Sequence, residues 1–104
     1  MQLTSYLENG RMTIALTGEI DHHCAKRYIE MIGAKIEAYT PSVCILDFED
    51  VTFMDSSGVA VVINTLRNMT RLRGSVCITG LHEQPYKVFQ ISGINKLVEM
   101  KGTE

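Results

Sequence analysis

The sequence predicts an α/β fold: a single domain in which helices pack against a mixed sheet. One observation is an N-terminal hairpin, because two short alternating segments, residues 3–7 and 12–16, flank Asn9-Gly10, a strong hairpin signal. The other is that segments with helical spacing then alternate with short apolar runs, in the order β-β-α-β-α-β-α-β. Strands that alternate with helices are typical of parallel pairing, so the sheet should combine a hairpin with parallel strands.

Three helices are predicted from apolar residues at spacings of three and four. They cover residues 24–38, a segment that ends near residue 73, and a short segment that starts near Pro85 and ends at Gly93. Gly74 is placed as the residue that ends the second helix at its C′ position.

The remaining strands are predicted at residues 43–48, 75–79 and 97–100. The first of these is an apolar run with little alternation, which favours a strand covered on both faces. Residues 19–23 and 49–54 are predicted to be loops, because polar side chains interrupt both segments.

Length and composition restrict the possible functions. A chain of 104 residues, 45% of them hydrophobic, fits one compact domain with a core of its own. Ten Lys and Arg against twelve Asp and Glu give a formal net charge of −2, which provides no basic field for nucleic acid. No apolar run approaches the ~20 residues that span a bilayer, and the N-terminus has no signal-peptide pattern. We therefore expect a cytoplasmic protein that binds neither nucleic acid directly nor membrane.

The three cysteines, Cys24, Cys44 and Cys77, are interpreted as reduced thiols. Their odd number and the lack of a C-x-x-C pattern argue against a disulfide framework or a zinc site. A reducing cytosol fits this composition. The Asp-His-His-Cys run that starts at Asp21 is a weak metal candidate, because adjacent side chains rarely all turn toward one ion, and we expect no metal.

The chemically informative segment is Asp55-Ser56-Ser57-Gly58, which apolar residues flank on both sides. The two serines fall at the N-terminus of the second predicted helix. Free backbone N–H groups and the helix dipole favour negative charge there, so a phosphoryl group would find donors. Taken alone, however, Asp-Ser-Ser before a helix is first of all a capping sequence. A cap and a modified hydroxyl can coexist because the turn holds two serines.

The sequence does not support a nucleophilic serine. A G-x-S-x-G elbow needs a glycine two residues to each side of the serine, and this pattern fails around both Ser56 and Ser57. A hydrolase also needs a histidine base with an orienting acid, and nothing marks His22, His23 or His82 as that base. We therefore expect no enzyme activity.

Three motifs together resemble a known family. They are Thr17-Gly18-Glu19-Ile20-Asp21, Phe53-Met54-Asp55-Ser56-Ser57-Gly58 and Ile91-Ser92-Gly93-Ile94. Their order and spacing are similar to those of the anti-sigma factor antagonists of the STAS family, above all the sporulation-type antagonists of Gram-positive bacteria. The likeness covers nearly the whole chain, so residues 1–104 are interpreted as one STAS domain. Family members usually carry another helix after the last strand, which we expect to be short or absent here.

The resemblance implies a switch at Ser56, the serine directly after the aspartate. The unphosphorylated form would bind a kinase-type anti-sigma factor, which would then release its sigma factor. Phosphorylation of Ser56 by that serine kinase would end the interaction. A phosphoserine phosphatase would remove the phosphate and restore the binding form. ATP and Mg²⁺ would be bound by the kinase, so the chain would need no cofactor. The phosphoryl group would lie beside Asp55, and near Glu19 and Asp21 if both turns face one edge of the sheet. We expect it to block binding by local repulsion.

Partner contacts are expected around this turn, at Asp21, Met54, Asp55, Ser56, Ser57 and Gly58. Asp21 is interpreted equally well as the N-cap of the first helix. Asp55 would help to present the serine, and Ser57 would cap the second helix. Gly58 would allow close approach of the partner backbone or relieve crowding in the turn. Met54, a flexible side chain beside the turn, is a further candidate for contact.

Other functions stay open at this point. The alternative is a STAS-like module that binds a nucleotide or another small ligand and signals to a different partner. The sequence does not name the sigma factor: the resemblance favours sporulation, but stress-response relatives share the same turn. It does not fix the oligomeric state either.

Overall fold

The computed structural model describes residues 3–102, which contain five strands, three α-helices and one short 3-10 helix. In chain order these are β1 (Leu3–Glu8), β2 (Arg11–Ile20), α1 (His22–Tyr39), β3 (Val43–Met54), α2 (Ser57–Arg71), β4 (Ser75–Leu81), α3 (Glu83–Ser92), η1 (Ile94–Lys96) and β5 (Glu99–Gly102). The predicted order of strands and helices is confirmed, and η1 is an addition before the last strand.

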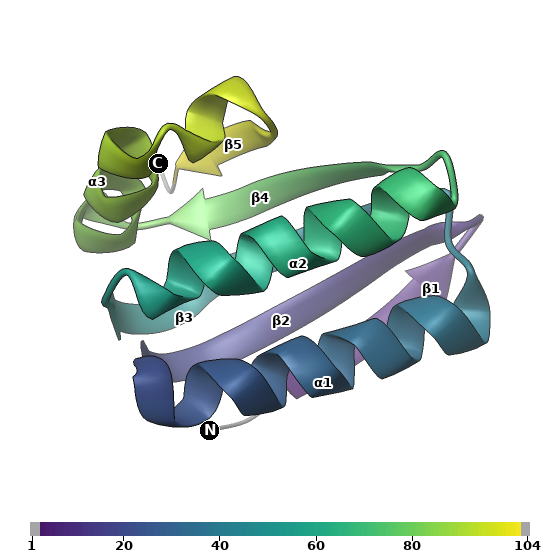
Figure 1. Cartoon of the computed structure of the whole chain (residues 1–104), viewed down its shortest axis with the longest axis horizontal. Coiled ribbons are helices and arrows are strands. Elements are labelled where there is room, and N and C mark those ends of the chain that lie inside the picture. Colours follow the sequence, from purple (N-terminus) through teal and green to yellow (C-terminus); the bar gives the residue numbers. More distant parts are fainter. Residues whose placement is uncertain (1–2, 103–104) are drawn as a thin grey trace.

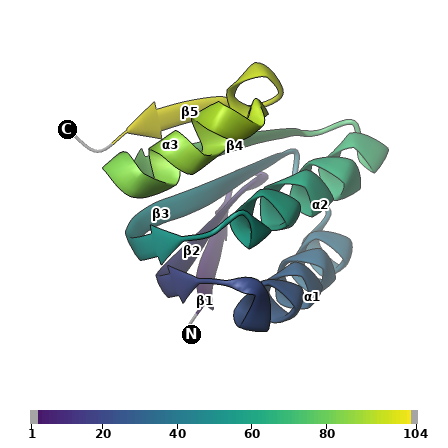
Figure 2. The same ribbon diagram turned by 60° about the vertical axis from the view of Figure 1, so that its left-hand side comes forward.

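The five strands form one mixed sheet in the order β1-β2-β3-β4-β5. β1 and β2 pair antiparallel, and every later pair of neighbours is parallel. α1 and α2 lie side by side across one face of this sheet, and α3 follows the carboxyl end of β4 (Figures 1 and 2). The predicted fold class, a hairpin joined to parallel strands, is confirmed.

The hairpin between β1 and β2 forms as the sequence predicts. Asn9 and Gly10 adopt φ of 54° and 79°, and Glu8 pairs with Arg11 on either side of them. A two-residue loop of this kind needs positive φ at both positions, and Asn followed by Gly tolerates it best.

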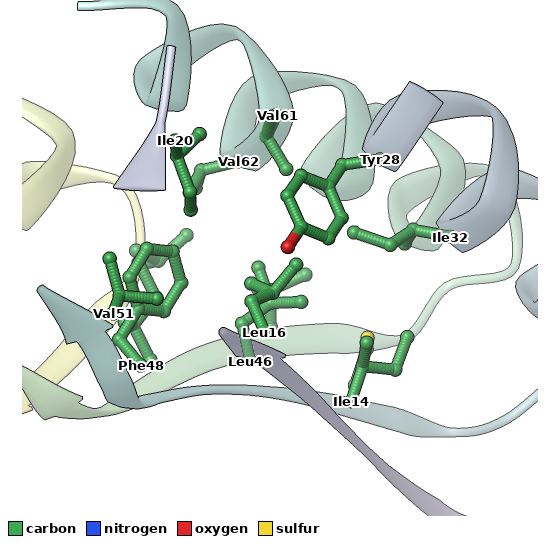
Figure 3. Close-up of a cluster of buried hydrophobic side chains, with 14 of the residues drawn as sticks. Ile14, Leu16, Ile20, Tyr28, Ile32, Leu46, Phe48, Val51, Val61 and Val62 are labelled. Atoms are coloured by element: carbon green, nitrogen blue, oxygen red, sulfur yellow. The ribbon is translucent and has the colours of Figure 1, made fainter. Parts of the chain in front are cut away.

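The core lies between the sheet and the layer formed by α1 and α2. Figure 3 shows Tyr28 of α1 and Val62 of α2 directed toward Leu16 and Leu46 of the strands, and all four are fully buried. The Tyr28 hydroxyl donates a hydrogen bond to the carbonyl oxygen of Thr17 at 3.0 Å. The polar end of this buried ring therefore has a partner, as buried tyrosines require.

The expectation that residues 43–48 are covered on both faces is wrong. Cys44, Leu46 and Phe48 are buried, whereas the side chains between them are only half-buried. The helices α1 and α2 cover one face of the sheet, so alternate residues of this apolar run point away from them (Figure 2).

Both predicted loops, residues 19–23 and 49–54, are also wrong. β2 continues to Ile20 and β3 to Met54, and the two strands pair with each other over this stretch. Register irregularities surround Gly18, whose φ is 81°. A bulge of this kind re-aims a strand without ending it, which explains why a glycine-marked break in the pattern is not the end of the strand.

The end of α2 differs in detail from the prediction. Arg73, not Gly74, adopts the left-handed conformation, with φ of 59°. Gly74 is needed for space instead, because a Cβ there would lie 2.6 Å from Met69 Cε and 2.7 Å from the Ser42 carbonyl oxygen. The Gly74 N–H donates to the Met69 carbonyl oxygen at 2.8 Å and completes the helix end.

Candidate functional site

Two turns meet at the carboxyl ends of β2 and β3. The strands are parallel neighbours, and the N–H of Asp55 donates to the carbonyl oxygen of Ile20 at 3.0 Å. The turn that contains Asp21 therefore lies beside the turn that contains Ser56. The condition under which a group on Ser56 would lie near Asp21, that both turns face one edge of the sheet, is therefore met.

Ser56 lies at the surface. It is exposed, directly precedes α2 with φ of −63° and ψ of −14°, and its side chain makes no capping hydrogen bond. β3 ends two residues before Ser56 and α2 begins directly after it, so an accessible hydroxyl stands on a fixed support. This geometry allows another protein to reach the oxygen.

The first-turn amides that we expected to be free have partners. The Ser57 N–H donates to Asp55 Oδ1 at 2.8 Å, the Gly58 N–H to the Asp55 carbonyl oxygen at 3.1 Å, and the Val59 N–H to the Ser56 carbonyl oxygen at 3.1 Å. The expectation that a phosphoryl group would find ready donors here is therefore wrong for these three amides. A charge on Ser56 would keep the general field of the helix dipole but few direct hydrogen bonds.

The side chain that caps α2 belongs to Asp55. Its carboxylate oxygen accepts the Ser57 N–H and satisfies one of the donors at the helix start. Within residues 3–102, the Ser57 hydroxyl makes no hydrogen bond, so the assignment of Ser57 as the capping side chain is wrong. The capping sequence is present, but Asp55 provides the cap, and neither serine hydroxyl has a hydrogen-bond partner among residues 3–102.

Met54 and Gly58 support the turn from inside. Met54 is 0% exposed, so its expected contact with a partner is wrong in this structure. Gly58 is buried, and a Cβ on it would lie 2.2 Å from Met54 Sδ. Of the two roles expected for Gly58, relief of crowding is the one that the structure supports.

Asp21 is the N-cap of α1. Its Oδ1 accepts the N–H groups of His23 at 3.0 Å and Cys24 at 3.2 Å, while its own N–H is directed to Cys24 Sγ at 3.4 Å. Partial desolvation acts to raise the pKa of Asp21, but the hydrogen bonds from Cys24 and His23 outweigh it and lower the pKa below 3.8. The capping interpretation is confirmed, and the half-buried carboxylate is also poised to stay charged at the shared edge.

The surroundings of Ser56 combine acidic groups with one apolar side chain. Glu19 is exposed and pairs in register with Phe53, which is 45% exposed. The sequence alone indicates only that Phe53 is an apolar residue flanking the turn. With Asp21 and Asp55 on the same edge, the surface near Ser56 carries acidic groups and an accessible aromatic ring, and aromatic rings are enriched where proteins bind one another.

Sequence reasoning missed Gln84 entirely. From α3, its Nε2 donates to the Met54 carbonyl oxygen at 2.8 Å and its Oε1 accepts the Met54 N–H at 2.9 Å. No local pattern could have revealed this contact, because it joins residues from two elements that are distant in the chain.

The described part of the chain, residues 3–102, holds no group of three or more side chains that could bind a metal ion. Within it, no helix has the length and apolar character that a membrane span requires. Cys24, Cys44 and Cys77 are all free thiols, with Cys44 buried and the other two half-buried.

Comparisons with known proteins give a consistent result. The STAS domain model matches residues 3–104. The anti-sigma F factor antagonist of Lysinibacillus sphaericus is 35% identical over 83 residues, which are 80% of this chain and 71% of that protein. The anti-sigma-B factor antagonist of Listeria monocytogenes is 25% identical over 97 residues, which are 93% of this chain and 84% of that protein.

Solved structures agree with these relatives. The anti-sigma factor antagonist SpoIIAA in its unphosphorylated form has a TM-score of 0.84 and 30% identity, covering 99% of this chain and 90% of that one. The Bacillus cell fate determinant SpoIIAA in the phosphorylated form has a TM-score of 0.74 and 30% identity, covering 99% and 93%. The chain therefore belongs to the STAS domain family, and these relatives within it are anti-sigma factor antagonists.

Proposed function

We propose that this chain is an anti-sigma factor antagonist that binds its anti-sigma factor only while Ser56 is unmodified. Phosphorylation of Ser56 by that factor, acting as a serine kinase, ends the interaction. The observation that carries the proposal is the exposed Ser56 hydroxyl at the start of α2, on the edge that it shares with Asp21. Relatives at 35% and 30% identity are anti-sigma factor antagonists, and SpoIIAA is known in phosphorylated and unphosphorylated forms.

The charge at the edge explains how the switch works. A phosphoryl group adds about −1.5 to −2 charges, here beside Asp55 and close to Asp21 and Glu19. The helix dipole offsets only about 0.3–1 kcal/mol at an exposed end. A partner surface fitted to a hydroxyl would have to desolvate an unpaired charge, at a cost of several kcal/mol. Binding is therefore blocked locally, without refolding.

The rest of the cycle follows from this assignment. The chain is a regulatory protein-binding domain and not an enzyme. It acts without a cofactor of its own, ATP and Mg²⁺ are bound by the kinase, and a phosphoserine phosphatase restores the binding form. We place the cycle in the cytoplasm and, from the likeness to sporulation-type antagonists, in sporulation. Asp21, Asp55, Ser57 and the exposed Phe53 supply contacts around the serine.

The test uses the full chain with the kinase-type anti-sigma factor of the same organism and MgATP. Mass spectrometry should find one phosphate on the unaltered chain and on Ser57→Ala, and none on Ser56→Ala. Calorimetry should show that Ser56→Asp weakens binding by about 100-fold or more, since about 2.8 kcal/mol corresponds to that factor.

Ser75→Asp is the matched control for added charge. Ser75 is also exposed, but it lies at the amino end of β4, at the opposite edge of the sheet. This variant should bind as the unaltered chain does. A phosphate on a residue other than Ser56, or unchanged affinity of Ser56→Asp, contradicts the proposal.

A further inference from the structure

The last part of β3 has a strand neighbour on one side only. Pairing with β4 extends from Val43 to Asp47 of β3, whereas pairing with β2 continues to Met54. The backbone groups of β3 beyond Asp47 that face away from β2 therefore bond to water where they are exposed, and need partners within the protein where they are buried, as at Met54.

Side chains at the start of α3 supply partners for Met54 and Glu49 of this segment. Gln84 bonds both backbone groups of Met54, its Oε1 accepting the N–H at 2.9 Å and its Nε2 donating to the carbonyl at 2.8 Å. Nε2 of His82 lies 2.7 Å from the Glu49 carbonyl oxygen. The N–H and C=O of one strand residue point to the same side, so the carboxamide of Gln84 imitates the peptide group of an adjoining strand.

We propose that Gln84 is a positioning residue for the phosphorylation of Ser56, an inference that rests on the function proposed above. Met54 is held by Gln84 from one side, and the next residue, Asp55, is held by Ile20 from the other. The backbone is thus fixed on both sides immediately before the serine. When the segment that carries the serine is already ordered, it loses less conformational freedom on reaching the transition state. Phosphoryl transfer from the kinase is therefore faster.

The contact requires an amide at this position. A carboxamide carries one acceptor and one donor group, which match the N–H and the carbonyl of Met54. A glutamate carboxylate can accept but not donate, and it would face the carbonyl oxygen. Methionine has nearly the same length and offers neither bond. Gln84→Glu and Gln84→Met therefore remove one and two of the hydrogen bonds with little change in volume.

Two measurements test the inference on the full chain. In amide hydrogen exchange, Gln84→Met should raise the exchange rates of Met54 and Asp55 by about tenfold, the loss expected for one to two hydrogen bonds. In phosphorylation with the anti-sigma factor and MgATP, the kcat for transfer to Gln84→Met should fall by about tenfold while KM stays within about twofold, because the exposed docking surface is unchanged. Gln84→Glu should also lower kcat, because its carboxylate keeps the bond to the Met54 N–H but repels the Met54 carbonyl oxygen. Circular dichroism checks that the variants are folded. A general loss of stability in a folded variant would not lower kcat while leaving KM unchanged.

Gln90→Met is the matched control, because Gln90 is exposed on the same helix and its side chain makes no hydrogen bond within residues 3–102. It should leave both exchange and kcat unchanged. If the unaltered chain is phosphorylated and the Gln84 variants match its kcat, the positioning role is overturned and the proposed function stands. If the unaltered chain takes no phosphate, both are overturned.

Discussion

The backbone N–H of Asp55 donates to the carbonyl oxygen of Ile20 across 3.0 Å, and this bond joins two turns that are distant in the sequence. It extends the pairing of β2 with β3 past the last strand residues, so Asp21 and Ser56 stand on one rigid edge. A charge attached to one turn is therefore close to the charges of the other. The switch proposed above would use this arrangement, in which an accessible hydroxyl stands on a fixed support.

Gly58→Ala should lower the free energy of unfolding by about 1–3 kcal/mol, the usual cost of overpacking. The added Cβ would lie 2.2 Å from Met54 Sδ, and Met54 is fully buried. Gly33→Ala in α1 is the matched control, because its Cβ would meet only Asn68 Nδ2 at 3.4 Å. It should raise the free energy of unfolding by about 0.5–1 kcal/mol. Urea unfolding of both variants measures this; equal effects would refute the packing role of Gly58.

Asp55→Ala should lower the free energy of unfolding by about 1 kcal/mol, because α2 loses the acceptor for the Ser57 N–H. Asp55→Asn keeps an oxygen in the same place and should lose less than half of that amount. Ser57→Ala should change stability by under about 0.5 kcal/mol, since its hydroxyl caps nothing within the described residues. The three variants are compared by urea unfolding. A larger loss for Ser57→Ala than for Asp55→Ala would restore Ser57 as the cap.

Some features of the fold and the site are determined by local sequence, and others are determined by contacts between distant segments. The hairpin at Asn9-Gly10 and the start of α2 could be predicted, because their chemistry is local: positive φ in one case and a capping sequence in the other. Which side chain of the capping sequence caps α2 could not be predicted. Asp55 and Ser57 carry equally suitable oxygens, and only the path of the backbone places the Asp55 oxygen at the free N–H.

The extensions of β2 to Ile20 and of β3 to Met54, and the hydrogen bonds from Gln84 of α3 to Met54, could not be predicted. The segment that ends β3 is rich in polar residues, and it is extended because Ile20 and its neighbours pair with it across the sheet. Gln84 reaches Met54 only once β4 has ended and α3 has folded back onto β3. Tertiary contacts decided both features, and a single sequence contains no periodic signal for them.

Arg73→Gly should raise the free energy of unfolding by about 0.5–1 kcal/mol. Arg73 has φ of 59°, a conformation that glycine adopts without the steric cost that a Cβ brings. Gly74→Ala should act in the opposite direction, by about 1–3 kcal/mol, because its Cβ would lie 2.7 Å from the Ser42 carbonyl oxygen. Thermal unfolding of the two variants checks the assignment. Destabilisation by Arg73→Gly would show that the arginine side chain contributes more than its backbone strain costs.

The buried Cys44 thiol should lower the free energy of unfolding as the pH rises above 9. Burial, with a smaller contribution from Cys77, raises the pKa of the Cys44 thiol from 9.0 to about 12. The folded state thus holds a neutral thiol that the unfolded chain ionises, so its contribution is complete below pH 9 and is lost as pH rises from 9 toward 12. The free energy of unfolding of the unaltered chain should fall more steeply over this range than that of Cys44→Ala, by up to about 1.4 kcal/mol per pH unit. Parallel curves would contradict the burial of this thiol.

Asp21 should contribute stability that disappears in acid. Although desolvation opposes it, hydrogen bonding to Cys24 and His23 holds the pKa of Asp21 below 3.8 in the folded chain. A lowered folded pKa gives stability that is present above pH 3.8 and is lost as pH falls through the folded value. Asp21→Asn keeps a capping oxygen without the charge, so the urea midpoint of the unaltered chain should exceed that of this variant near pH 6, and the difference should shrink toward pH 3. A difference that stays constant or grows on acidification would mean that the charge of Asp21 plays no part in capping α1.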